Sequence, residues 1–249
     1  MVNTSKCVGD MGVEKSTPTY PEWLKISQYV TVVMVNYSGY SEDNTNLLLA
    51  CLKSVRHFYP NIRIIVVDGT PSECEFFNSV KDVVSKFNNV TFIPCGYNIG
   101  HGRGMNIGIT LAETPYVLIC DTDVTIDYKN SIEDMLALAK DNTLAIGQII
   151  PVPKQSYGLS CGGDNILIVA PYFHIINKKE YVRYLPYIHN GGPTCLTMAD
   201  VFSRGLEKEV LIDFPVRKYV AHPGGGSRGT LGEVIIVSEW KPKDFFDVV

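Results

Sequence analysis

The stretch Tyr116-Val-Leu-Ile-Cys120 runs directly into Asp121-Thr-Asp123. A short apolar run of this kind predicts a buried β-strand. Two carboxylates at the end of a buried strand are costly unless a cation or a proton transfer uses them. Because one residue separates the aspartates, an extended backbone would turn both side chains to the same side. Such a pair suits a hard divalent cation whose other positions go to a diphosphate and water.

On both sides of this stretch, β-branched runs alternate with helical patterns from Tyr29 onward, which predicts an α/β fold with a parallel sheet covered by helices. The expected strands are 30–36, 62–68, 90–94, 116–120 and 144–152, and the expected helices are 43–58, 71–87, 102–113 and 128–140. Beyond Pro151 the regular alternation stops. There the patterns predict strands at 166–176, 210–214 and 217–221 and a helix at about 198–208.

Composition limits the classes of function. The 249 residues are 45% hydrophobic, enough for a substantial core, and the formal net charge of -4 gives no basic face for a nucleic acid. Seven cysteines without a Cys-x-x-Cys pair favour neither a disulfide framework nor a structural zinc site. No stretch reaches the roughly 18 apolar residues of a membrane helix. We therefore expect no transmembrane segment, and a cytoplasmic chain that either stays in solution or works at the periphery of a membrane.

Asp68 closes another expected strand, so two strands of one sheet end in aspartates. Ligands of open α/β sheets bind outside the carboxyl ends of the strands, which predicts a pocket shared by the two acidic ends. The alternative is that Asp68 only caps the helix expected to follow it.

A glycine-dense stretch from Asn98 to Gly108 lies between the two acidic ends and enters a helix. Its backbone N–H groups and Arg103 could approach phosphate oxygens, or the stretch could be a flexible connection. Neither the Rossmann glycine pattern nor a Gly-Lys-Ser/Thr phosphate loop is matched. His222, which follows a strand and precedes three glycines, could bind a metal or satisfy the backbone at a strand end.

Together these pieces resemble a nucleotide-sugar glycosyltransferase of the GT-A fold, most similar to family 2. The resemblance runs from Tyr29 to about His222 and implies a central, mainly parallel sheet flanked by helices. It rests on an ordered series of motifs: Val35-Asn36-Tyr37, Asp68-Gly69, Asn98-x-Gly100 through Asn106-x-Gly108, and Asp121-Thr-Asp123 as the family's Asp-x-Asp.

The resemblance also implies the roles of individual residues. Donor binding would use Asn36, Tyr37 and Asp68 for base and ribose, and also Asn98. His101, Arg103 and Asn106 would lie near the diphosphate or the base, Asp121 near the ribose or metal-bound water, and Asp123 on the metal. A divalent cation, Mn²⁺ or Mg²⁺, would be held by Asp123 and His222 with Asp121 as helper. Asp200 is the expected general base, although Ala199 stands where the family has a second acidic residue.

The function implied is transfer of a sugar from a UDP-, GDP- or dTDP-sugar to a hydroxyl of a glycan, a lipid-linked acceptor or a protein. Inversion is expected from a single base. The family's later Gln-x-x-Arg-Trp helix is not recognisable, which favours one sugar per encounter. The implied parts are an N-terminal extension (1–28), a nucleotide-sugar-binding subregion (29–127), an acceptor and catalytic subregion (128–228) and a C-terminal tail (229–249).

Two other functions stay open at this stage. A sugar-phosphate nucleotidyltransferase has a related fold, but it needs a cationic loop after the first strand, and Asn36 to Tyr40 supplies no cation. An inactive relative that binds nucleotide sugars or glycans is supported by Ala199 alone.

Overall fold

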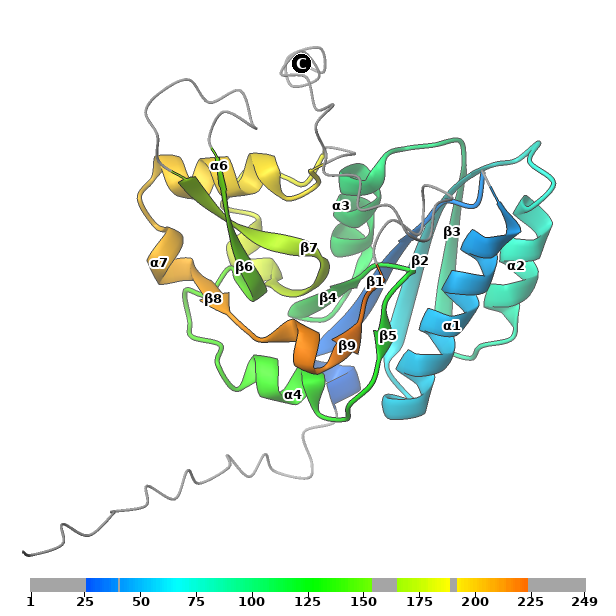
Figure 1. The fold of residues 1–249 in the computed structure, drawn as a ribbon, viewed down its shortest axis with the longest axis horizontal. Helices are drawn as coiled ribbons and strands as arrows, with labels where there is room; N and C mark the ends of the chain where they lie inside the picture. Colours follow the sequence, from blue (N-terminus) through cyan, green and yellow to red (C-terminus); the bar gives the residue numbers. More distant parts are fainter. Residues whose placement is uncertain (1–25, 40, 154–164, 189–191, 224–249) are drawn as a thin grey trace, which may run out of the picture.

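The computed structural model describes residues 26–39, 41–153, 165–188 and 192–223. The expected C-terminal tail and most of the N-terminal extension lie outside these ranges. Figure 1 shows a twisted sheet through the centre of the molecule, with helices on both faces. The main sheet has seven strands in the order β3-β2-β1-β4-β7-β6-β8. This confirms the expected α/β fold.

The half of the sheet that begins at the first strand is parallel throughout. It contains β1 (Val30–Asn36), β2 (Arg63–Pro71), β3 (Val90–Gly96) and β4 (Tyr116–Cys120). The crossovers between them are α1 (Glu42–Phe58), α2 (Phe77–Ser85) and α3 (His101–Leu111). Ser41 caps α1 by accepting a hydrogen bond from the amide of Asp43.

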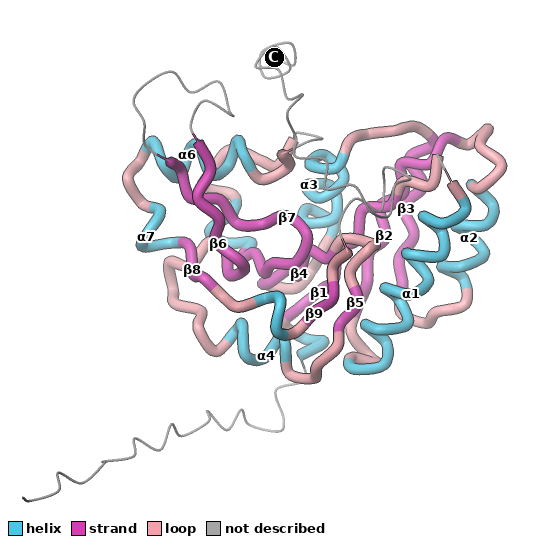
Figure 2. The backbone as a smooth tube through the Cα atoms, viewed as in Figure 1, coloured by secondary structure: helices cyan, strands magenta, loops and turns pink. Residues whose placement is uncertain are grey.

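The other half of the sheet contains β7 (Asn165–Asn177), β6 (Ala145–Pro153) and β8 (Leu211–Asp213). Because β7 is antiparallel to both β4 and β6, and β8 is parallel to β6, β7 is the one described strand of this sheet that runs against the others. Two short strands, β5 (Thr125–Ile126) and β9 (Val220–Ala221), pair separately. Figure 2 shows all of these strands gathered between the helices.

The sheet buries apolar residues on both faces. On one face, Val32 and Met34 of β1 pack with α1, α2 and the short helix α4 (Ser131–Leu136). On the other, Val33 of β1 packs with α3, α5 (Lys178–Tyr181), α6 (Cys195–Ser203) and α7 (Glu207–Val210). Burial on both faces explains why the parallel strands are continuous apolar runs. No helix in the described ranges is both long and apolar enough to span a membrane.

The glycines of α3 let this helix approach β1 closely. A Cβ added at Gly104 would lie 2.6 Å from Cγ1 of Val35, and one added at Gly108 would lie 2.2 Å from Cγ1 of Val33. Real side chains do not come this close, so only glycine fits at these two positions. Two glycines of the glycine-dense stretch, Gly104 and Gly108, thus serve the packing of the helix on the sheet. The glycine pattern by itself predicts only a phosphate-binding loop or a flexible connection.

Several expected elements have different limits. The helix expected at 71–87 is only α2, because β2 extends to Pro71. Only Ser131–Leu136 of the helix expected at 128–140 is α-helical. The helix expected at about 198–208 is replaced by α6, which begins three residues earlier, and by α7. The strand expected at 217–221 is reduced to β9, because Arg217 and Lys218 belong to a 3-10 turn, η3 (Val216–Lys218).

Candidate metal and nucleotide site

The two aspartates after β4 lie in a turn and not in an extended stretch. The amide of Val124 donates to the carbonyl of Asp121 over 3.1 Å, which closes the turn. The amide of Asp121 donates to the carbonyl of Tyr172 in β7 over 2.8 Å. The expectation that strand alternation aligns Asp121 and Asp123 is therefore wrong, because the turn brings their carboxylates together.

His222 completes a cluster with these aspartates. One ligand atom each from Asp121, Asp123 and His222 lies within 4.8 Å of the other two, and Nε2 of His222 is 3.4 Å from Oδ1 of Asp123. The pairing of β5 with β9 brings His222 here, because β5 begins two residues after Asp123 and β9 ends directly before His222. Two carboxylates and one imidazole are a donor set that fits a divalent cation such as Mn²⁺.

His101, the first residue of α3, also contacts Asp121. Its Nε2 is 3.0 Å from Oδ1 of Asp121. Burial lowers the pKa of His101, but the contact with Asp121 and the charge of Asp123 outweigh burial, so the pKa is raised. The start of α3 is thereby joined to the acidic turn after β4.

A second, fully buried histidine lies in β7 behind the turn. Nε2 of His174 is 3.2 Å from the hydroxyl of Tyr187. Burial lowers the pKa of His174 to about 4, against an opposing effect of the charge on Asp121. At neutral pH His174 is thus an uncharged group in the core and adds no positive charge to the site.

The end of β2 has a different environment. Asp68 lies within β2, is 0% exposed, and accepts hydrogen bonds from Nδ2 of Asn36 over 2.9 Å and from the hydroxyl of Thr70 over 2.7 Å. Burial raises the pKa of Asp68, and these hydrogen bonds oppose the rise. Asn36 also donates to the hydroxyl of Ser38. The expectation that Asp68 ends its strand is wrong, since β2 continues to Pro71. The hydrogen bonds of Asp68 join it to the end of β1.

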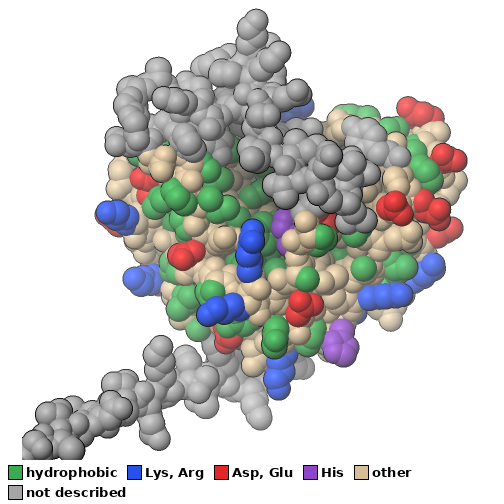
Figure 3. Space-filling model, in the orientation of Figure 1, with side chains coloured by type: hydrophobic (Ala, Val, Ile, Leu, Met, Phe, Trp, Pro, Cys, Tyr) green, Lys and Arg blue, Asp and Glu red, His purple; other side chains and the backbone are tan. Residues whose placement is uncertain are grey.

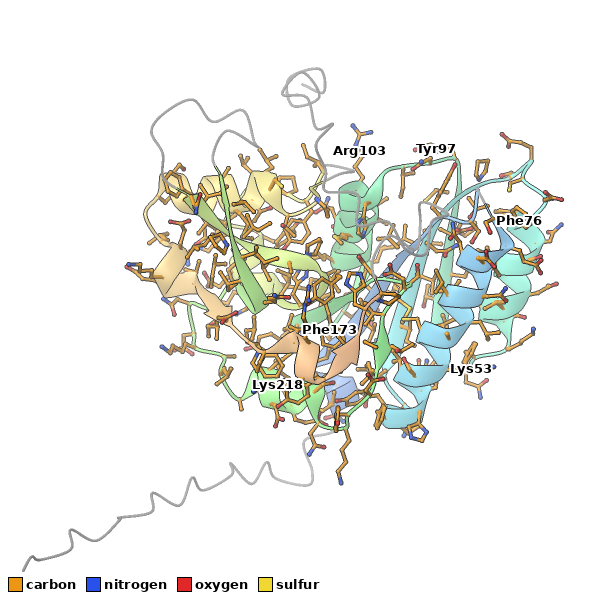
Figure 4. The ribbon with its side chains drawn as sticks, in the orientation of Figure 1. Lys53, Phe76, Tyr97, Arg103, Phe173 and Lys218 are labelled. Carbon is orange, nitrogen blue, oxygen red and sulfur yellow. The ribbon has the colours of Figure 1, made fainter. Side chains whose placement is uncertain are left out.

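In the loop between β3 and α3, Tyr97 and Asn98 are exposed and Ile99 is buried. The side-chain oxygen of Asn98 accepts a hydrogen bond from the amide of Gly100, which has a positive φ of 78° and is the N-cap residue of α3. Figure 4 shows Arg103 and Tyr97 at the same end of the molecule, with Arg103 pointing away from the sheet. The N-cap residue Gly100 has no side chain that could cap α3.

Asn106 of α3 connects the two halves of the molecule. Its side-chain oxygen accepts a hydrogen bond from the hydroxyl of Tyr181 over 3.0 Å, and that hydroxyl also accepts one from the amide of Tyr187. Sequence reasoning assigned Asn106 to the donor, whereas this contact is made within the chain. Tyr37, also assigned to the donor, is half-buried directly after β1.

Asp200 lies in the second half of α6 and not at the start of a helix as expected. Its carboxylate accepts hydrogen bonds from Nε and an Nη of Arg204, each over 2.9 Å, and from the amide of Leu185 over 2.9 Å. Only 11% of the Asp200 side chain is exposed. The contacts of Asp200 therefore hold the loop at Leu185 against α6.

Sequence reasoning missed Tyr172, which contacts two members of the acidic cluster. Besides the backbone hydrogen bond to Asp121, its ring stacks on the ring of His222 with a centroid separation of 4.2 Å and an angle of 14° between the planes. No motif marks Tyr172, because it lies within a long apolar strand. Only the antiparallel register of β4 and β7 could have revealed it.

Comparison with known proteins places this architecture. Residues 31–202, more than half of the chain, match the family model described as Glycosyl transferase family 2. Mannosyltransferase PcManGT from Pyrobaculum calidifontis, solved with GDP-Man and Mn²⁺, superposes with a TM-score of 0.55 at 15% identity, over 75% of this chain and 54% of that chain. Residues 1–349 of TarS from S. aureus superpose with a TM-score of 0.51 at 16% identity, over 78% and 60%.

These structural likenesses concern the fold, and the chain spans a little over half the length of the two structures. The resemblance to the GT-A fold drawn from the motifs is confirmed. On the match over residues 31–202, the chain belongs to glycosyl transferase family 2.

Proposed function

We propose that this chain is a metal-dependent glycosyltransferase that moves one sugar per encounter from a nucleoside diphosphate sugar to an acceptor hydroxyl, with inversion. The observation that carries the proposal is the cluster of Asp121, Asp123 and His222 beside the first residue of α3. Membership in family 2 supports the reaction class, and the similar fold of a mannosyltransferase solved with GDP-Man and Mn²⁺ supports the kind of ligand.

Asp123 and His222 would hold the cation, Mn²⁺ or Mg²⁺, with Asp121 as helper. When bound, the cation offsets the negative charge of the leaving diphosphate. The amide groups at the start of α3, which begins at His101, and the guanidinium of Arg103 would bind phosphate oxygens, because a helix N-terminus carries a partial positive charge. Asn98 shapes this loop through its hydrogen bond to Gly100.

Asn36, Tyr37 and Asp68 would bind the base and ribose. Asp68 already accepts hydrogen bonds from Asn36 and Thr70, so it suits the recognition of N–H or O–H groups better than the binding of a metal. Asn106 would act indirectly, by joining α3 to Tyr181 and so fixing the first turn that contacts the phosphates.

Asp200 is the proposed general base, which would take the proton of the attacking hydroxyl on the face opposite the leaving group. Arg204 donates hydrogen bonds to both of its oxygens, which fixes the orientation of the carboxylate. The half of the chain over 128–228 would then supply the acceptor side, and the half over 29–127 the donor side.

An inactive glycan-binding relative is the second candidate, and one observation favours it. Hydrogen bonds from Leu185 and Arg204 already engage the carboxylate of Asp200, and Ala199 beside it carries no acid. Nothing comparable favours a nucleotidyltransferase, since Asn36 to Gly39 offer no cation after β1. The acceptor would be a glycan, a lipid-linked saccharide or a protein, reached from the cytoplasm or from a membrane surface.

The test is release of nucleoside diphosphate from UDP-, GDP- and dTDP-sugars with Mn²⁺ present. A thermal-shift screen first identifies the donor, because a ligand that binds the native state raises the melting midpoint. Mn²⁺-dependent release that disappears in Asp123→Asn supports the proposed enzyme. Mn²⁺-dependent donor binding without hydrolysis or transfer from any of these donors would favour the binding relative.

A further inference from the structure

Tyr172 holds two of the three residues of the cluster from one position in β7. It is 6% exposed. Its carbonyl accepts the 2.8 Å hydrogen bond from the amide of Asp121, and its ring stacks on His222 at 4.2 Å. Backbone and side chain of this residue therefore reach separate parts of the chain, the turn after β4 and the segment after β9.

The ring of Tyr172 is itself fixed by its surroundings. Its hydroxyl donates to the side-chain oxygen of Gln148 in β6. Burial raises the pKa of Tyr172, and the nearby Arg217 of η3 opposes the rise. The phenol is therefore neutral and keeps its proton for Gln148. Because the hydroxyl of Tyr172 is held by β6 and its backbone carbonyl by the amide of Asp121, its ring can serve as a rigid surface for His222.

Within the described ranges, the side chain of His222 contacts the ring of Tyr172 and the carboxylate of Asp123. It follows β9, a strand of two residues that pairs only with β5 among the described strands. That pairing places the backbone before His222, but it does not by itself fix the rotation of the imidazole about its side-chain bonds. Stacking on Tyr172 restricts this rotation, because the imidazole plane must stay nearly parallel to the tyrosine ring. In the observed orientation, Nε2 of His222 lies 3.4 Å from Oδ1 of Asp123.

Stacking also favours the metal-bound state. An imidazole that donates its lone pair to a cation becomes more positive, and the electron-rich face of a tyrosine attracts positive charge. The contact is thus stronger with the metal than without it. Groups that orient a metal ligand in this way affect metal affinity although they do not touch the metal.

We propose that Tyr172 is a positioning residue of the metal centre, which orders His222 by stacking and Asp121 by its backbone carbonyl. This inference rests on the proposed metal-dependent function, because the cluster must bind a cation for the positioning to matter. The chemistry it contributes is orientation, and neither its hydroxyl nor its ring takes part in the transfer.

The test is Mn²⁺ affinity of the full chain, measured by electron paramagnetic resonance with nucleoside diphosphate present. Tyr172→Leu removes the ring and is expected to weaken Mn²⁺ binding by about 10- to 100-fold, the range found for groups that support metal ligands. Tyr172→Phe keeps the ring and should bind Mn²⁺ nearly as the wild type does. Unchanged affinity in Tyr172→Leu, alongside a loss in Asp123→Asn, would overturn the positioning role alone.

Tyr59→Leu is the matched control for lost stability. Tyr59, directly after α1, is similarly buried at 7% exposure, and its hydroxyl makes hydrogen bonds to Ser131 and Glu133 of α4. The Tyr59→Leu variant should melt at a lower temperature than the wild type yet keep the Mn²⁺ affinity. If Tyr59→Leu weakened Mn²⁺ binding as much as Tyr172→Leu does, a general loosening would explain both and the inference would be wrong.

A metal-free measurement separates this inference from the proposed function. The ring protons of His222, assigned in proton–carbon spectra through His222→Ala, should be shifted upfield by the tyrosine ring current. The shift should persist in Tyr172→Phe and vanish in Tyr172→Leu. Signals that stay unchanged in Tyr172→Leu would refute the stack itself, whereas equal Mn²⁺ binding by the wild type and Asp123→Asn would refute the metal site.

Discussion

Aspartates follow apolar runs both in the second half of β2 and directly after β4, yet the two places differ in what surrounds the carboxylates. Asp68 in β2 is fully buried among Asn36 and Thr70, which donate hydrogen bonds to it. Asp121 and Asp123 after β4 keep 20% and 11% of their side chains exposed and lie beside His101 and His222.

The neighbouring strands cause this difference. Asp68 lies next to β1, where Asn36 is its partner in register. Asp121 lies next to the antiparallel β7, and the turn that follows it leads to β5 and so to β9 and His222. An acidic strand end is therefore not a metal site by itself. The carboxylates after β4 are partly exposed and lie beside imidazoles, whereas Asp68 in β2 lies among hydrogen-bond donors. Figure 3 shows both acidic and basic side chains spread over the face seen there.

The largest expected effect concerns a carboxylate outside both places, that of Asp200. Asp200→Asn should lower turnover by about 100- to 10,000-fold, the range for loss of a general base, and leave donor affinity nearly unchanged. Steady-state kinetics and donor titration measure the two quantities. Arg204→Gln is the control, because it frees the carboxylate without removing it. If both variants lose turnover and melting temperature to the same degree, Asp200 only anchors the loop at Leu185.

Asp123→Asn and Asp68→Asn sharpen the comparison directly. Removing a metal ligand should weaken Mn²⁺ binding by more than about 100-fold, since even groups that only support a ligand cost about 10- to 100-fold. Asp68→Asn should leave the Mn²⁺ affinity unchanged and weaken donor binding instead. Isothermal titration with Mn²⁺ and then with the donor separates the two effects. Equal loss of Mn²⁺ binding in both variants would contradict the assigned difference between the strand ends.

Gly108→Ala tests how closely α3 packs on β1, which places the first residue of α3, His101, beside Asp121. The added methyl group would meet Cγ1 of Val33 at 2.2 Å, and overpacking of a core typically costs about 1–3 kcal/mol. We expect the free energy of unfolding, measured by urea denaturation, to fall by that amount. Val33→Ala in the same chain makes room for the methyl group. The double variant should therefore lose less stability than the sum of the single losses, and strict additivity would argue against the contact.

The smallest expected effect is a gain in stability. Because burial raises the pKa of Asp68 above its ordinary value near 3.8, the folded state binds a proton more readily than the unfolded chain there. Its contribution to stability is therefore fully favourable below about pH 4 and falls as the pH rises. The Asp68→Asn variant has no titratable group at this position. Its free energy of unfolding, compared with that of the wild type at the same pH, should therefore increase from about pH 4 upward. Urea denaturation as a function of pH measures the difference, and a variant that becomes relatively less stable as the pH rises would contradict it.

Sequence patterns predicted the parallel half of the molecule well because each of its strands is an unbroken apolar run. Val30–Asn36 and Tyr116–Cys120 were placed to the residue. The antiparallel half was harder, since β5 and β9 are too short to have a pattern and α6 and α7 break one expected helix.

Among site residues, motif order indicated Asp121, Asp123 and His222, which the fold brings together. It could not indicate that Arg204 engages Asp200 or that Tyr172 stacks on His222, because both contacts depend on tertiary packing. Contacts between distant segments are the part of the site that patterns along one chain do not carry.

The most direct test of the central claim is the position of Mn²⁺ in crystals grown with Mn²⁺ and a nucleoside diphosphate, located by anomalous scattering. Our account predicts one peak within about 2.3 Å of a carboxylate oxygen of Asp123 and of Nε2 of His222, the distance usual for divalent cations. A peak at Asp68, or full nucleotide density with no anomalous peak at the end of β4, would contradict it.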